Sequence, residues 1–124
     1  MMILISAERS TLDEATNGLR MERLACRLRR EGLAFERGRG AWGGRTETVL
    51  AVTCPAASVP VVVGIAEAFE QEAVLWVDAL GDAALYWLAD RSTEPLGEWR
   101  EVSEAEAVAA GEWTEIGGRY WRAG

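Results

Sequence analysis

Residues 3–20 read Ile3-Leu4-Ile5-Ser6-Ala7-Glu8-Arg9-Ser10-Thr11-Leu12-Asp13-Glu14-Ala15-Thr16-Asn17-Gly18-Leu19-Arg20, and a basic amphipathic run continues to Arg29. Three branched apolar residues in succession predict a buried strand that ends at Ser6. Ser10 or Thr11 is expected to cap the following helix, because acidic residues stand in its first turn. A strand, loop and helix junction presents backbone donors to ligands, so residues 6–10 are the first candidate site. The alternative is an ordinary turn that binds nothing.

The size and charge of the chain set the class of protein. Its 124 residues predict one domain, residues 1–124. No apolar run approaches the ~20 residues that cross a membrane, and Met1–Ile5 is too short for a signal peptide, so we expect a cytoplasmic protein without a membrane partner. The net charge of −7 argues against nucleic acid as a partner, although five arginines lie between Arg20 and Arg30.

The chain contains no histidine. This removes the commonest general base, the commonest metal ligand, and every Ser-His or Cys-His catalytic pair. Cys26 and Cys54 are isolated and lack the spacing of metal ligands, so no metal site is predicted. Any chemistry must use carboxylates, backbone dipoles, aromatic faces or groups of the substrate itself.

The remaining pattern predicts alternating helices and strands. Four glycines within Gly38–Gly44 predict an exposed loop carrying Trp42, which would be an interface anchor or a ligand platform. We expect strands at 47–54, 73–77 and 83–88, a second helix from about residue 60 to 70, and a hairpin at 113–121. This order predicts an α+β fold, a ferredoxin-like βαββαβ sandwich with two helices on one face of an antiparallel sheet and an extra C-terminal hairpin.

Ser6, Ala7, Arg9 and Ser10 form an S-A-x-R-S signature. With matching positions that span most of the chain, this signature resembles that of the phage-encoded S-adenosylmethionine lyases, formerly called SAM hydrolases. Further matching positions are Asn17, Arg20, Leu28, Arg29, Gly40, Trp42, Glu47-Thr48-Val49, Glu70-Gln71, Val74-Leu75, Glu101-Val102, Gly111, Trp113, Thr114, Gly118, Arg119 and Trp121.

The resemblance implies cleavage of S-adenosylmethionine to 5′-methylthioadenosine and L-homoserine lactone without a cofactor. It further implies a homotrimer resembling PII signalling proteins, with sites at subunit interfaces. The implied role is to deprive host restriction and modification systems of their methyl donor in the cytoplasm of an infected bacterium.

Six residues are candidates for this site. Glu47 is the expected catalytic residue, holding the ammonium or ribose of a bent substrate. Gln71 would bind an amine, carboxylate or adenine edge, and Trp42 would stack on adenine or face the sulfonium. Ser6, Ala7 and Arg9 complete the predicted substrate-binding set, although Arg9 could equally pair with surface acids.

Three other readings stay open. A SAM hydrolase would use water as nucleophile and a carboxylate as base. An acidic protein without activity could block a restriction enzyme by imitating DNA. A PII-like regulator could bind an adenine ligand without consuming it.

Overall fold

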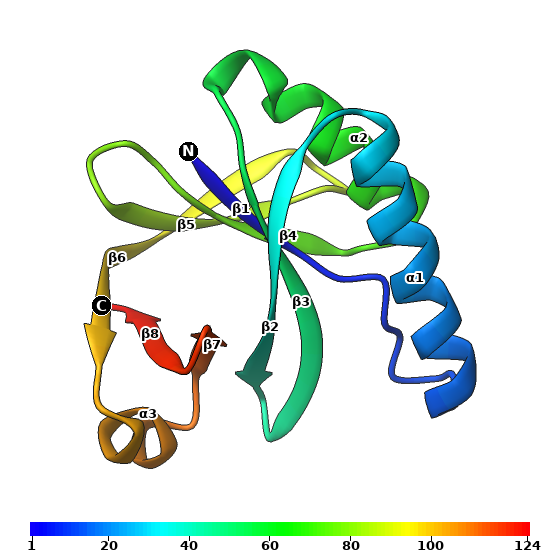
Figure 1. Ribbon diagram of the computed structural model, residues 1–124. Helices are drawn as coiled ribbons and strands as arrows, with labels where there is room; N and C mark the ends of the chain where they lie inside the picture. Colours follow the sequence, from blue (N-terminus) through cyan, green and yellow to red (C-terminus); the bar gives the residue numbers. More distant parts are fainter.

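The computed structural model describes residues 1–124 and shows an eight-stranded antiparallel sheet closed into a barrel (Figure 1). The strands follow one another around the barrel in the order β1-β3-β2-β7-β8-β6-β5-β4, and β4 pairs with β1. They are β1 (Met2–Ile5), β2 (Ala34–Trp42), β3 (Arg45–Thr53), β4 (Ala73–Val77), β5 (Asp82–Trp87), β6 (Ser92–Val102), β7 (Trp113–Ile116) and β8 (Arg119–Ala123).

Three α-helices accompany the barrel: α1 (Glu14–Arg30), α2 (Val59–Ala68) and α3 (Glu104–Ala110). A short 3₁₀ turn, η1 (Ala56–Ser58), precedes α2. The cap of α1 is Asp13, whose carboxylate accepts from Thr16 N–H, and not Ser10 or Thr11 as expected. None of the helices has the length and apolar character needed to cross a membrane.

The expected ferredoxin-like, PII-like sandwich is therefore wrong. The hairpin of β7 and β8 does not hang at one end of an open sheet; it lies between β2 and β6 and closes the barrel. β6 was not expected because Pro95-Leu96-Gly97 has the composition of a turn. In the structure Leu96 is the extra residue of a β-bulge, since Pro95 and Gly97 pair with the adjacent residues Ala84 and Ala83.

The predicted glycine-rich loop is also wrong, because its first half is the end of β2. Gly38 pairs with Ile116, and a Cβ built on Gly38 would lie 2.3 Å from the backbone oxygen of Glu115. Only glycine permits this close approach of β7 to β2. Gly43 and Gly44 form the turn to β3, and both have positive φ.

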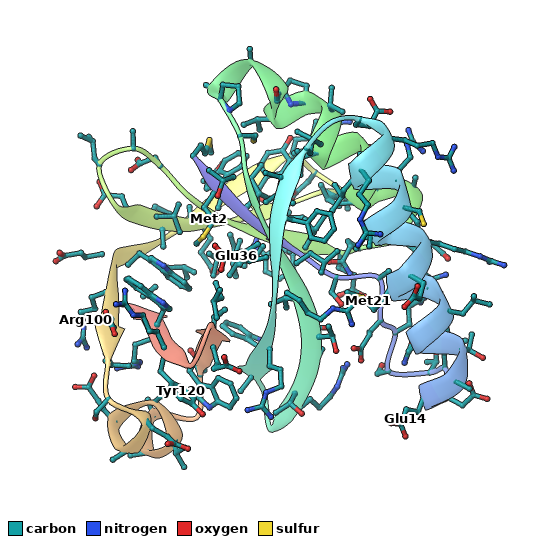
Figure 2. The ribbon with its side chains drawn as sticks, viewed as in Figure 1. Met2, Glu14, Met21, Glu36, Arg100 and Tyr120 are labelled. Atoms are coloured by element: carbon teal, nitrogen blue, oxygen red, sulfur yellow. The ribbon has the colours of Figure 1, made fainter.

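The main apolar core lies outside the barrel, between its strands and the two longer helices. Ile3, Ile5, Leu50 and Val52 project from β1 and β3 into a cluster that contains residues of α1 and α2. Figure 1 shows these two helices on the same side of the barrel, and Figure 2 shows Met21 on the side of α1 that faces it. The other face of the strands lines the barrel interior, so several strands read as continuous apolar runs.

Candidate functional site

A cavity of about 240 Å³ opens at one end of the barrel. Four of the predicted site residues line it, namely Ser6, Trp42, Glu47 and Gln71. They come from the end of β1, the β2–β3 hairpin and the residues before β4. The barrel therefore brings together four candidates from three segments that are far apart in the chain.

The β2–β3 hairpin places Glu47 and Trp42 at the cavity. Gly40 pairs with Glu47 and Trp42 pairs with Arg45 in the antiparallel ladder. Because Gly40 has no side chain, the space beside the Glu47 carboxylate stays open. Trp42 is 57% exposed, which places an unusually large apolar surface at the rim.

The backbone of residue 6 orients Gln71. Ser6 N–H donates a 3.0 Å hydrogen bond to Gln71 Oε1. The Ser6 hydroxyl donates in turn to Thr48 O at 2.7 Å, so the end of β1 is tied to β3. With its oxygen held in this way, the Gln71 amide keeps its NH₂ group as a donor for a ligand.

Of the five backbone N–H groups in the candidate stretch 6–10, the hydrogen bonds of the structure engage four and do not include that of Ser10. Four successive N–H groups are bonded within the chain: those of Ser6 to Gln71 Oε1, Ala7 to Met21 Sδ, Glu8 to Ser6 Oγ and Arg9 to Asn17 Oδ1. Ala7 is fully buried and lines none of the cavities described here. This loop is a rigid support for the site.

Arg9 lies beside the cavity. Its guanidinium forms an ion pair with Glu70, a surface acid from the end of α2, and not with Glu8, Asp13 or Glu14. Arg9 lines two polar cavities of about 690 and 390 Å³, and Glu47 lines both of these as well. The region around Glu47 is therefore open on several sides.

Burial and a neighbouring charge raise the pKa of the Glu47 carboxyl above its ordinary value. The larger cause is desolvation, the second is the like charge of Glu8, and the Arg45 guanidinium opposes both. Glu8 is fixed in place because its carboxylate accepts from Thr48 N–H at 2.8 Å. Glu8, Glu47 and Arg45 thus lie around the same opening, together with the Arg9–Glu70 pair.

Several cavity residues had no predicted role. Arg45, Thr46, Trp113 and Thr114 all line the 240 Å³ cavity. Trp113 and Thr114 are matching positions of the family pattern, and that was the only signal for them in the sequence. No group of three or more acidic or thiol side chains is arranged to hold a metal ion.

A comparison with curated proteins finds none that matches the chain. The model of the S-adenosylmethionine lyase family matches residues 3–124. Apart from Met2, the first residue of β1, this match covers the strands of the barrel, and it covers every residue that lines the 240 Å³ cavity. The chain therefore belongs to the S-adenosylmethionine lyase family, and it is an enzyme whose substrate is S-adenosylmethionine.

Proposed function

We propose that the enzyme converts S-adenosylmethionine to 5′-methylthioadenosine and L-homoserine lactone by attack of the substrate carboxylate on its own Cγ. The observation that carries this proposal is the meeting of Glu47 and Trp42, from the β2–β3 hairpin, with Gln71, from the segment before β4, at one cavity. A carboxylate, an indole face and an amide donor are complementary to an ammonium, a sulfonium and an acceptor edge.

The substrate supplies both reacting groups. One carboxylate oxygen forms a bond to Cγ, and the Cγ–S bond breaks with its electron pair going to sulfur. The sulfonium leaves as a neutral thioether and the carboxylate becomes a five-membered ester, so no proton is transferred. This reaction needs neither a metal nor a cofactor. Holding the substrate bent is the main requirement, and such positioning is worth roughly 7–11 kcal/mol in favourable cases.

Glu47 would hold the substrate ammonium and fix the bend, because it is the carboxylate shared by all three cavities around the opening. Gln71 would donate its amide N–H to the substrate, and Trp42 would cover the sulfonium. Ser6 would act through Gln71, while Ala7 and Arg9 would hold the loop. The net charge of −7 favours the approach of a substrate with a net positive charge.

The assembly we propose is a homotrimer with sites completed between subunits. Its support is the apolar surface near the opening, where Trp42 is 57% exposed and Trp87 is 38% exposed. A neighbouring subunit would cover these indoles. The proposed role is to remove the methyl donor of restriction and modification systems in the cytoplasm of a host bacterium infected by a phage that encodes the enzyme.

The test is incubation of the purified protein with S-adenosylmethionine, without added metal, followed by chromatography and NMR over time. We expect methylthioadenosine together with homoserine lactone, and homoserine only later by hydrolysis. Glu47→Gln should abolish most of the turnover, and Glu98→Gln, an exposed residue of β6, should retain it. Light scattering on the same samples gives the subunit number.

The alternatives give different results. Homoserine as the first product would show that water attacks, as in a hydrolase. Unchanged turnover in Glu47→Gln would remove Glu47 from the site. A monomer with full activity would exclude the shared sites.

A further inference from the structure

The left-handed residue that ends α2 is a glutamate. Gln71 N–H donates to Ala66 O at 3.1 Å, and Glu70 N–H donates to Glu67 O at 3.0 Å. This is the hydrogen-bond pattern of a Schellman motif, in which the residue after the C-cap takes a positive φ. That residue is Glu70, with a φ of 64°. Glycine is usual at such a position, because a Cβ is strained there.

The same chain uses glycine at the ends of its other two α-helices. α1 ends in the same motif with Gly32 at a φ of 70°, and α3 ends at Gly111 with a φ of 80°. Apart from Glu70, Arg91 is the only residue other than glycine with a positive φ. Backbone strain of this kind is found mainly where a function requires the side chain.

The Glu70 carboxylate lies between two guanidinium groups. It forms an ion pair with Arg9 and contacts Arg20 Nη1 at 3.5 Å. The Glu70 side chain is 58% exposed, and ion pairs with this exposure contribute little to stability. Stability alone therefore does not explain a strained glutamate at this position, and the explanation lies in what the carboxylate holds.

Glu70 lies at the opening that contains the candidate site. It lines the 390 Å³ cavity together with Glu47 and Gln71. The backbone of Arg9 is fixed by Asn17, whose Oδ1 accepts from Arg9 N–H at 2.9 Å and whose Nδ2 donates to Arg9 O at 3.0 Å. The Glu70 carboxylate holds the side-chain end of Arg9, so the loop after β1 is fixed against the end of α2.

We propose that Glu70 is a positioning residue for the binding of S-adenosylmethionine and that it acts through Arg9. Its carboxylate keeps Arg9 at the opening and thereby fixes the two segments that carry Ser6 and Gln71 relative to each other. A glycine at position 70 would make the same turn with less strain but without this ion pair. The inference rests on the proposed function, in which Gln71 binds the substrate and Ser6 acts through Gln71.

The test compares Glu70→Gly with Glu70→Gln. Both variants remove the carboxylate, but only glycine relieves the strain of the positive φ. We expect both to raise KM for S-adenosylmethionine roughly 3- to 10-fold with a smaller change in kcat. Glu70→Gly should unfold at the same urea concentration as the wild type or at a higher one, whereas Glu70→Gln should gain no stability.

Arg91→Gly is the matched control. Arg91 also has a positive φ, of 57°, and its guanidinium also forms an exposed ion pair, with Glu67. Arg91 lines none of the cavities at the opening. We expect this variant to keep or gain stability in urea, as Glu70→Gly does, with an unchanged KM.

A double variant tests whether the effect passes through Arg9. In the Arg9→Gln background, Glu70→Gln should raise KM by less than about 2-fold, because the partner of the carboxylate is already gone. A residue with a merely structural role would change stability and would not show this coupling in KM.

Three results would overturn the proposal: an unchanged KM in both variants of Glu70, a Glu70→Gly protein that unfolds at a lower urea concentration than the wild type, or additive effects of Glu70→Gln and Arg9→Gln on KM. KM is taken from the consumption of S-adenosylmethionine, so it is defined whichever nucleophile attacks. Homoserine as the first product would refute the proposed function and leave this comparison intact.

Discussion

Arg20 Nε donates a 2.6 Å hydrogen bond to the carbonyl oxygen of Ala7. The same guanidinium donates to Phe69 O at 2.7 Å and contacts the Glu70 carboxylate at 3.5 Å. Arg20 thereby joins the loop after β1 to the end of α2. These are the segments that lead to Ser6 and Gln71 at the cavity.

The first prediction is that Arg20→Lys weakens substrate binding. An ammonium lacks the planar fork that bonds to two carbonyl oxygens at once, so the two loops lose their common anchor. We expect KM for S-adenosylmethionine to rise roughly 10-fold with a smaller change in kcat, and stability to fall by about 1–2 kcal/mol. Arg23→Lys, at an exposed position of α1, is the control. An unchanged KM would refute the positioning role.

The second prediction concerns pH. If ionised Glu47 holds the ammonium, kcat/KM falls as the pH drops through the raised pKa of Glu47, because the carboxyl becomes protonated. Glu8→Gln removes a like charge and should move this acidic limb to lower pH. Arg45→Gln removes the opposing cation and should move it to higher pH. The measurement is kcat/KM as a function of pH for the wild type and the two variants. A shift of the acidic limb in the same direction in both variants would contradict the assigned role of Glu47.

The third prediction uses the space opposite Glu47. A Cβ on Gly40 would lie 3.4 Å from Val49 Cγ1, so a side chain here is tolerated by the fold and points toward the cavity residues. Gly40→Val should keep the melting temperature within a few degrees and lower kcat/KM by more than about 10-fold, or 1.4 kcal/mol. Gly18→Ala, in open space on α1, serves as the control.

The fourth prediction concerns the closing of the barrel. Gly38→Ala would place its Cβ against the Glu115 backbone oxygen, which cannot move without breaking the β2–β7 ladder. We expect a loss of about 3 kcal/mol in the free energy of unfolding. Gly64→Ala in α2 meets no atom within 4 Å and should instead add about 0.5–1 kcal/mol. Chemical denaturation measures both, and equal effects would be inconsistent with this account.

The fifth prediction is that Met21→Leu destabilises the protein although it nearly conserves volume. Met21 Sδ accepts from the buried Ala7 N–H at 3.2 Å, and leucine cannot accept. The unpaired N–H should cost about 1–3 kcal/mol. Leu24→Met, a similar exchange in the same buried face, should cost less than about 1.5 kcal/mol. Similar losses in the two variants would argue against the Met21 acceptor.

The elements with strong local signals were predictable from the sequence. The first strand, the helix that follows it, the strand at 73–77 and the hairpin at 113–121 were all confirmed. The resemblance also selected Glu47, Trp42 and Gln71, which the structure places at one cavity.

The topology was not predictable because it depends on contacts between distant residues. Gly38 reads as a loop residue, yet it is needed where β7 approaches β2. Pro95 and Gly97 read as a turn, yet they flank a bulge in a long strand. Thr114 was given no role for the same reason, since it reaches the cavity at the opening only when the C-terminal hairpin closes the sheet.

The position of the β7–β8 hairpin between β2 and β6 affects how the enzyme folds. β7 and β8 are the last strands to leave the ribosome, and until they dock, β2 and β6 each expose an unpaired edge. At that stage the chain forms an open sheet that contains only the pairings among β1 to β6. The pairing of Gly38 with Ile116 joins residues far apart in the chain, so its formation is intrinsically slow. Because Thr114 lines the cavity at the opening, the same step that removes the exposed edges also completes the lining of this cavity.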